Sequence, residues 1–172
     1  MDGFDRDTLV VSSPLGPLTL IAEGGALTAV DFGAPDGRDP GGSTDPLLAE
    51  TGRQLEAYFS GERRDFDLPL RPSGTPFQLE VWRAVRDIPY GETVSYGELA
   101  TRIGRPTAAR AVGRANGQNP LAIVVPCHRV IGADGTLTGY AGGLQMKATL
   151  LAIESPRRED GRCRPWSRCY AP

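Results

Sequence analysis

Three short runs near the N-terminus are rich in apolar and β-branched residues, with polar residues and turn signals between them, which is typical of β-strands. Two glycine-containing pairs, Gly16-Pro17 and Gly24-Gly25, separate the runs as hairpin turns would. The runs cover residues 8–11, 18–21 and 27–30. The pattern therefore predicts a small antiparallel sheet.

The spacing of apolar residues becomes helical further along the chain. Apolar residues recur at helical spacing up to Gly61, so we expect one amphipathic helix that carries Leu47, Leu48, Leu55 and Phe59. Residues 1–73 contain neither histidine nor cysteine. We interpret this region as a scaffold domain built from a sheet and a helix.

Helix-start signals dominate residues 74–156, the expected second domain. Thr75-Pro76-Phe77-Gln78 and Ser95-Tyr96-Gly97-Glu98 each have the spacing of a capping box, and the first also has proline at the first helical position. Further helices are expected from Thr107 to about Asn116 and over 144–154. The whole chain is therefore predicted to be α+β, with a mostly helical second domain.

Two of these short helices are joined by a turn that contains Gly104, an arrangement typical of a helix-turn-helix. A plain helical hairpin would give the same apolar pattern. The arginines on and around the two helices favour the DNA-binding interpretation. They are Arg102, Arg105, Arg110 and Arg114.

The net charge of −2 hides a strong asymmetry along the chain. Residues 1–70 hold 13 acidic and 5 basic side chains, whereas residues 71–172 hold 8 acidic and 14 basic ones. Such a distribution suggests that the second half meets a polyanion, although an ordinary solvated face would produce it too.

Composition places the chain among cytoplasmic globular proteins. No apolar run approaches the length of a transmembrane helix, and the acidic N-terminus lacks the apolar core of a signal peptide. Three cysteines at uneven spacing do not make a disulfide framework and suit a reducing compartment.

The candidate chemistry lies at Cys127-His128, where the only histidine directly follows a cysteine. A thiol becomes a good nucleophile when an imidazole takes its proton. Neighbours in sequence need not be neighbours in space, so the dipeptide alone would also fit a buried structural cysteine.

The surrounding motifs decide between these interpretations. From Tyr90 to Glu154 the chain resembles the O6-alkylguanine-DNA alkyltransferases, also called methylated-DNA–protein-cysteine methyltransferases, and residues 8–70 resemble more loosely their ribonuclease-H-like N-terminal domain. The resemblance does not extend beyond about Glu154. The matching pieces are Ile88-Pro89-Tyr90-Gly91-Glu92-Thr93, Ala109-Arg110-Ala111-Val112-Gly113, Asn119-Pro120, Pro126-Cys127-His128-Arg129-Val130 and Gly139-Tyr140-Ala141-Gly142-Gly143.

The resemblance implies roles for the catalytic residues. Cys127 would be the nucleophile that keeps the alkyl group, and His128 the base that activates it through a bridging water. Glu154 would orient the histidine, and Asn119 would brace the active-site turn. Without the resemblance, we would interpret Glu154 as a solvent-exposed residue at a helix end and Asn119 as an ordinary turn residue before proline.

The resemblance also implies contacts with DNA and with the damaged base. Arg110 matches the arginine finger that fills the space of a flipped base, on a helix whose other implied DNA contacts are Ala108, Ala109, Gly113 and Arg114. Tyr96 matches the tyrosine linked to base flipping and proton donation. Lys147 matches a lysine near the pocket, or is a helix-surface charge. The implied pocket walls are Val130, Tyr140, Ala141 and Gly142.

Position 141 departs from some members of the family, which have a serine there. Alanine has no hydroxyl to offer guanine O6, which leaves the preference among alkyl sizes open. The implied partner is double-stranded DNA containing O6-alkylguanine. We expect a monomer without membrane association, and leave open whether binding along DNA is cooperative.

No cofactor or metal is expected. Cys163 and Cys169 are too few for a zinc site, and residues 1–126 contain neither cysteine nor histidine.

Two other functions fit parts of the pattern. A protein that binds alkylated bases without transfer would lack the cysteine, which this chain keeps. A cysteine hydrolase would need an oxyanion hole, for which the sequence gives no signal.

The C-terminal tail, residues 157–172, has five arginines and only two acidic residues. Its few apolar residues predict disorder. We expect either an auxiliary, sequence-independent contact to DNA phosphates or a solubilising tail without a further role.

Overall fold

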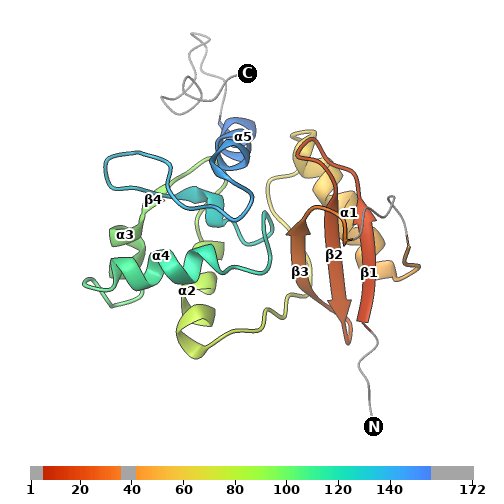
Figure 1. The fold of residues 1–172 in the computed structure, drawn as a ribbon, viewed down its shortest axis with the longest axis horizontal. Helices are drawn as coiled ribbons and strands as arrows, with labels where there is room; N and C mark the ends of the chain where they lie inside the picture. Colours follow the sequence, from red (N-terminus) through yellow and green to blue (C-terminus); the bar gives the residue numbers. More distant parts are fainter. Residues whose placement is uncertain (1–5, 36–41, 156–172) are drawn as a thin grey trace. The chain divides into compact units, whose positions relative to one another are not determined.

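A computed structural model of the protein describes residues 6–35 and 42–155 (Figure 1). The chain divides into two compact units. The first contains the described residues up to Ser73 together with Pro120–Val124, and the second contains Gly74–Asn119 and the described residues from Val125 onward. The basic tail at 157–172, for which disorder was expected, lies outside the described residues.

The first unit contains the predicted antiparallel sheet. Its strands are β1 (Arg6–Val11), β2 (Leu18–Glu23) and β3 (Ala26–Phe32), in the order β1-β2-β3, with a register irregularity between Ile21 and Ala22. The strands extend one or two residues beyond the predicted runs at most ends, because the hairpin pairing continues up to the turns.

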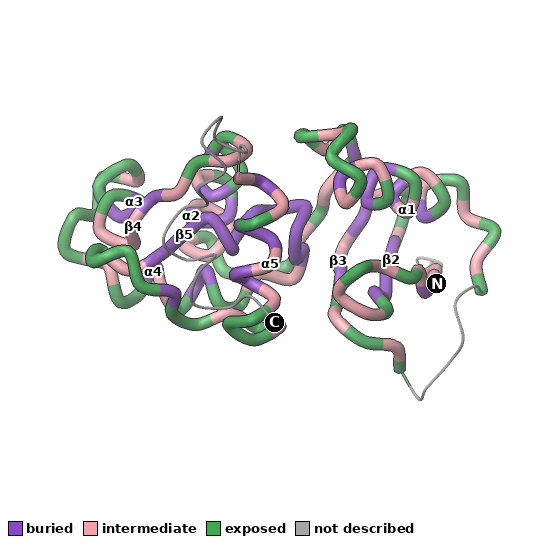
Figure 2. The backbone as a smooth tube through the Cα atoms, turned by 90° about the horizontal axis from the view of Figure 1, so that it is seen from above, coloured by how far each residue is buried: buried purple, intermediate pink, exposed green. Residues whose placement is uncertain are grey.

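One helix, α1 (Pro46–Phe59), contacts all three strands and closes the core of the first unit (Figure 1). Asp45 caps it by accepting hydrogen bonds from the backbone N–H groups of Leu47 and Leu48, and Pro46 occupies the first turn. Its buried face carries the leucines predicted from the helical spacing, Leu48 and Leu55, together with Tyr58. Buried residues lie mainly in the interior of each unit (Figure 2).

The segment Pro120–Val124 lies within the predicted second domain, residues 74–156, but most of its contacts are with the first unit. The N–H of Val30 donates to the carbonyl of Pro120 at 2.9 Å, and Val30 and Leu121 form a parallel bridge. Ile123 has φ 71°, alone among the described non-glycine residues in having a positive φ. Such a conformation is costly for a β-branched residue, so packing must hold it.

The second unit contains helices α2 (Pro76–Arg86), α3 (Tyr96–Arg102), α4 (Ala109–Gly117) and α5 (Leu144–Glu154). Both predicted capping boxes are present, at Thr75/Gln78 and Ser95/Glu98. Helix α4 begins at Ala109, two residues later than predicted, and Ala108 at its cap position makes no side-chain hydrogen bond. Helices α3 and α4 form the predicted helix-turn-helix.

Two very short strands were not predicted. β4 (Val94–Ser95) and β5 (Val130–Ile131) pair in parallel and place the residues after the Cys-His motif beside the start of α3. Strands of two residues are too short to show an alternating pattern. Directly before β5 the chain forms η2, a single turn of 3-10 helix at Cys127–Arg129. Helices α5 and α2 both contact this turn.

Candidate active site

Cys127 is held at the start of η2 by hydrogen bonds to the turn around it. The Asn119 Nδ2 donates to the Val125 carbonyl at 2.8 Å, which is the bracing role that the resemblance implied for this residue. Asn116, which the sequence analysis did not single out, donates from Nδ2 to the Cys127 carbonyl at 3.2 Å. The two asparagines therefore hold the turn at carbonyls on either side of Pro126.

The thiol of Cys127 is buried, with 6% of the residue exposed. Burial raises the pKa of this thiol, because a thiolate loses its hydration there, while Asn119, Lys147 and Tyr140 act in the opposite direction without overcoming burial. Cys127 is therefore a protonated thiol in the resting protein, and a base must remove its proton before it can act as a nucleophile.

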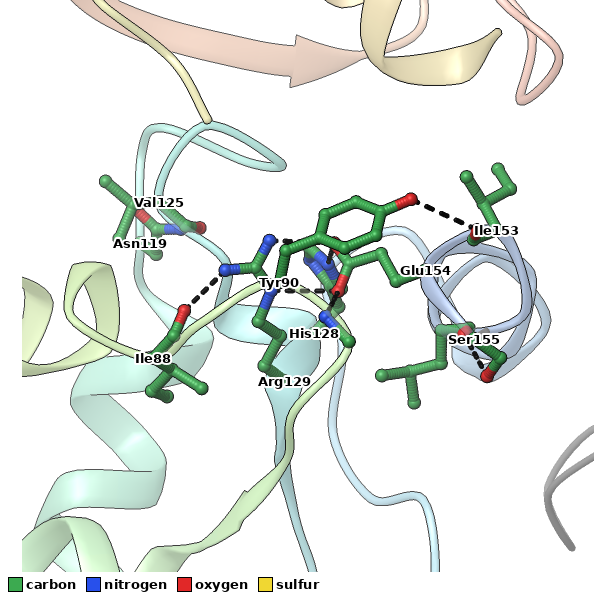
Figure 3. A network of polar contacts seen from close by, with 11 residues as sticks. Ile88, Tyr90, Asn119, Val125, His128, Arg129, Ile153, Glu154 and Ser155 are labelled. Carbon is green, nitrogen blue, oxygen red and sulfur yellow. Dashed lines mark hydrogen bonds and ion pairs between the residues drawn. The ribbon is translucent and has the colours of Figure 1, made fainter. Parts of the chain in front are cut away.

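His128 and Glu154 meet inside the unit, as the resemblance implied (Figure 3). The His128 Nε2 lies 2.7 Å from the Glu154 Oε1, and both side chains are almost completely buried. The alternative of a solvated helix end for Glu154 is therefore wrong.

The electrostatics of this pair indicate which nitrogen carries the proton. Burial alone would raise the pKa of Glu154, but hydrogen bonds and charge from His128 and Arg129 outweigh it and lower the pKa to about 2. Burial also lowers the pKa of His128, despite the opposing effect of Glu154. A neutral imidazole beside a carboxylate donates its Nε2–H, which leaves the Nδ1 as the acceptor. No described residue hydrogen-bonds the buried Nδ1.

Arg129 completes this buried cluster, and sequence reasoning did not assign it a role. Its Nε donates to the Glu154 Oε2 at 2.9 Å and its Nη2 to the Glu154 Oε1 at 3.0 Å (Figure 3). A signal was available, because Arg129 lies between the apolar run 121–125 and the apolar pair Val130-Ile131, and a buried charge must be paired.

Lys147 is fully buried, so the alternative of a helix-surface charge is wrong. Its Nζ donates to the Val130 carbonyl at 2.6 Å and to the Thr138 carbonyl at 2.8 Å. Burial lowers the pKa of this ammonium group to about 8, although Cys127 acts to raise it. The lysine therefore connects α5 with β5 and with the loop that leads to Tyr140.

Tyr96 contacts the same loop from the start of α3. Its hydroxyl donates to the Thr138 carbonyl at 3.1 Å, and the Lys147 Nζ lies 5.9 Å from the centre of its ring. A side-chain hydrogen bond with Tyr140 acts to lower the pKa of the Cys127 thiol. Burial raises the pKa of the Tyr140 phenol well above its usual value, and Cys127 adds to this shift. The following residues of the implied pocket, Ala141 and Gly142, are exposed and half-buried respectively.

The surface of α4 carries two open grooves that meet at Arg110. The first, of about 420 Å³, also includes Arg114 and the start of α2, and the second, of about 410 Å³, includes Tyr96. Arg110 and Arg114 are exposed, whereas Ala108, Ala109 and Gly113 are half-buried. The small residues at 109 and 113 and the loop at Thr138 and Gly139 also line the second groove. This surface can receive an anionic, extended ligand.

The part of the chain that the structure describes shows neither a metal-binding cluster nor a membrane-spanning helix. Within residues 6–35 and 42–155, no three histidine, cysteine or acidic side chains are grouped so that they could hold a metal ion. No helix in these ranges is both long and apolar enough to cross a membrane.

A buried cysteine and a buried histidine–carboxylate pair, in one unit with a helix-turn-helix, are the features expected of a DNA-binding protein with cysteine chemistry. Two family models match the chain. The DNA-binding domain of the 6-O-methylguanine DNA methyltransferases matches residues 76–156, and the ribonuclease-like domain of the same proteins matches residues 9–72.

Curated proteins and solved structures agree with these matches. A methylated-DNA–protein-cysteine methyltransferase of Mycolicibacterium paratuberculosis is 55% identical over 147 residues, covering 84% of this chain and 89% of the relative. One of Methanosarcina acetivorans is 50% identical over 149 residues, covering 84% and 96%. A crystal structure of Mycobacterium tuberculosis OGT in complex with DNA has 51% identity and a TM-score of 0.75, covering 86% of this chain and 93% of that one. The chain belongs to the 6-O-methylguanine DNA methyltransferase family.

Proposed function

We propose that this protein repairs alkylated DNA directly, by transferring the alkyl group from O6 of guanine, or O4 of thymine, to its own Cys127. The observation that carries the proposal is the buried Cys127–His128–Glu154 cluster within a domain of the 6-O-methylguanine DNA methyltransferase type. The relatives are named as methylated-DNA–protein-cysteine methyltransferases, and one solved relative is in complex with DNA.

The transfer is a displacement at the alkyl carbon. The thiol proton of Cys127 passes to the His128 Nδ1, through a water as in the family, while the Sγ forms a bond to the alkyl carbon. The bond from that carbon to guanine O6 breaks, and its electron pair stays on the base. Tyr96 donates a proton to the departing guanine. The product is a thioether, which has no route back to a thiol, so each molecule reacts once.

The cluster supports this chemistry through its protonation state. The ionised Glu154 keeps the proton of the neutral imidazole on Nε2, so that Nδ1 can accept the thiol proton and the cation formed is stabilised. Asn119 holds the backbone of the turn that presents Cys127. Lys147 fixes the Val130 carbonyl, and its charge favours the thiolate.

The damaged base must leave the helical stack before a buried thiol can reach it. We assign Arg110 to the space that the base vacates, because it is exposed on α4 between the two grooves. Ala108, Ala109 and Gly113 are small enough for α4 to approach the minor groove, and Arg114 faces the phosphates. The flipped base is received by Val130, Tyr140, Ala141 and Gly142.

The partner in this proposal is double-stranded DNA containing O6-alkylguanine, bound by one protein molecule. A stoichiometry experiment tests the function: a fixed amount of protein is mixed with excess duplex that carries one O6-methylguanine per molecule. Repaired guanine should reach a plateau at one per protein molecule. Continued turnover would indicate a hydrolase, and binding without any repair would indicate a protein that only recognises alkylated bases.

A further inference from the structure

Arg129 is a buried charge to which the transfer mechanism gives no task. Only 5% of the residue is exposed, and it lies next to the catalytic histidine in the sequence. Its guanidinium binds both carboxylate oxygens of Glu154, at 2.9 and 3.0 Å. Paired forks of this kind are the strongest and most directional contacts that arginine makes.

Two further contacts fix the guanidinium in place. The Arg129 Nη1 donates to the Ile88 carbonyl after α2, and the guanidinium carbon lies 5.7 Å from the centre of the Tyr90 ring (Figure 3). The Glu154 Oε2 also accepts a hydrogen bond from the N–H of Gly91 at 3.4 Å. Arg129 and the N–H of Gly91 thus both hold the Glu154 carboxylate, in addition to its contact with His128.

The charges in this cluster cancel only when His128 is neutral. Glu154 carries one negative charge, which Arg129 balances. A proton on His128 would add an unbalanced positive charge among buried groups, with Lys147 on α5 contributing further repulsion.

Helix α2, which also packs against η2, adds no buried charge near His128. It buries only Val81, Trp82 and Val85, and its Arg83 and Arg86 are exposed. Glu80 pairs with Arg105. Among the described residues near His128, Glu154 is therefore the sole carboxylate, and Arg129 shares it.

We propose that Arg129 is a positioning residue for the transfer reaction, which keeps Glu154 charged and oriented and keeps His128 in the neutral form with its proton on Nε2. In a histidine–carboxylate pair without such an arginine, the carboxylate stabilises the protonated histidine fully. Here Arg129 offsets part of that stabilisation. Burial of the imidazole, which is the largest cause, and the charge of Arg129 together lower the pKa of His128, so it remains available as a base at pH values where an ordinary histidine is already protonated.

The test uses the fact that the chain contains one histidine. NMR titration of a 15N-labelled histidine reports its protonation and tautomer directly, in the wild type and in Arg129→Gln. The wild type should show the Nε2-protonated neutral form down to a pH below the usual histidine range. In Arg129→Gln the midpoint should move upward by about one pH unit, since a like charge has been removed from its vicinity. Arg129→Lys, which keeps the charge, should move it less.

The reaction with free O6-benzylguanine provides the second measurement, and this part rests on the proposed function. The acidic limb of its pH–rate profile should move upward in Arg129→Gln in parallel with the NMR midpoint, while Arg83→Gln on the exposed side of α2 leaves it in place. An unshifted limb with a rate reduced equally at every pH would show a purely structural role and overturn the proposal. A wild-type histidine that titrates in the usual range, or that carries its neutral proton on Nδ1, would overturn it even if Arg129→Gln does not fold. Absence of any reaction in the wild type would instead contradict the proposed function.

Discussion

The His128 Nε2 and the Glu154 Oε1 lie 2.7 Å apart although 26 positions separate the two residues in the chain. Helix α5 brings the carboxylate to the histidine, and η2 presents the histidine immediately after Cys127. The contact fixes the tautomer of the base beside the nucleophile, so its loss should affect both reactivity and stability.

Replacing Glu154 by glutamine should slow the reaction with O6-benzylguanine by about 10²-fold, in the range of effects that general-base catalysis supplies. The amide can no longer balance the buried Arg129, so the free energy of unfolding should also fall by about 3 kcal/mol. Single-turnover kinetics and urea unfolding measure the two effects.

Glu80→Gln, which removes an exposed partner of Arg105, is the matched control and should change the free energy of unfolding by less than about 1 kcal/mol. A rate unchanged in Glu154→Gln would remove Glu154 from the mechanism.

Stability should decrease in acid in two stages with distinct origins. The pKa of His128 is lower in the folded protein than its ordinary 6.5, so below about pH 6.5 the unfolded chain takes up a proton that the folded protein does not, and stability falls. The pKa of Glu154 is lowered from 4.5 to about 2, so its contribution is complete above pH 4.5 and is lost as the pH falls toward 2.

Urea unfolding between pH 3 and 8, expressed as the difference between the wild type and each variant, separates the two stages. His128→Gln should lack the decrease that begins near pH 6.5, and Glu154→Gln should lack the one that begins near pH 4.5. Difference curves that are flat across both ranges would mean that neither group changes its pKa on folding.

Much of the fold could be predicted from local signals. The capping boxes at Thr75 and Ser95 were predicted correctly because each is set by residues three positions apart. The bounds of α5, Leu144–Glu154, were also confirmed. By contrast, β4 and β5 owe their pairing to contacts between distant segments, and two residues carry no period.

The polar contacts of the site show the same limit. The resemblance pointed to Cys127, His128, Glu154 and Asn119, but neither Arg129 nor Asn116 received a role. Both act through partners distant in the sequence, Glu154 for Arg129 and the Cys127 carbonyl for Asn116. Local patterns report capping, turns and amphipathic faces, whereas pairing of buried polar groups depends on which segments the fold brings together.

Replacing Arg110 by alanine should impair repair of duplex DNA on the order of tenfold or more, because nothing then occupies the space of the flipped base. Reaction with free O6-benzylguanine needs no flipping and should keep its rate. Single-turnover rates on both substrates make the comparison, and Arg83→Ala, an exposed arginine on α2, serves as the control. Equal losses on the two substrates would place Arg110 in the pocket or in folding instead.

The location of the transferred group tests the central claim most directly. The protein is incubated with a duplex that carries one O6-methylguanine, and its peptides are then analysed by mass spectrometry. We predict a single methyl group on the peptide that contains Cys127, and none in Cys127→Ser, which should still bind the duplex. A methyl group on Cys163 or Cys169, or one acquired by Cys127→Ser, would contradict the account.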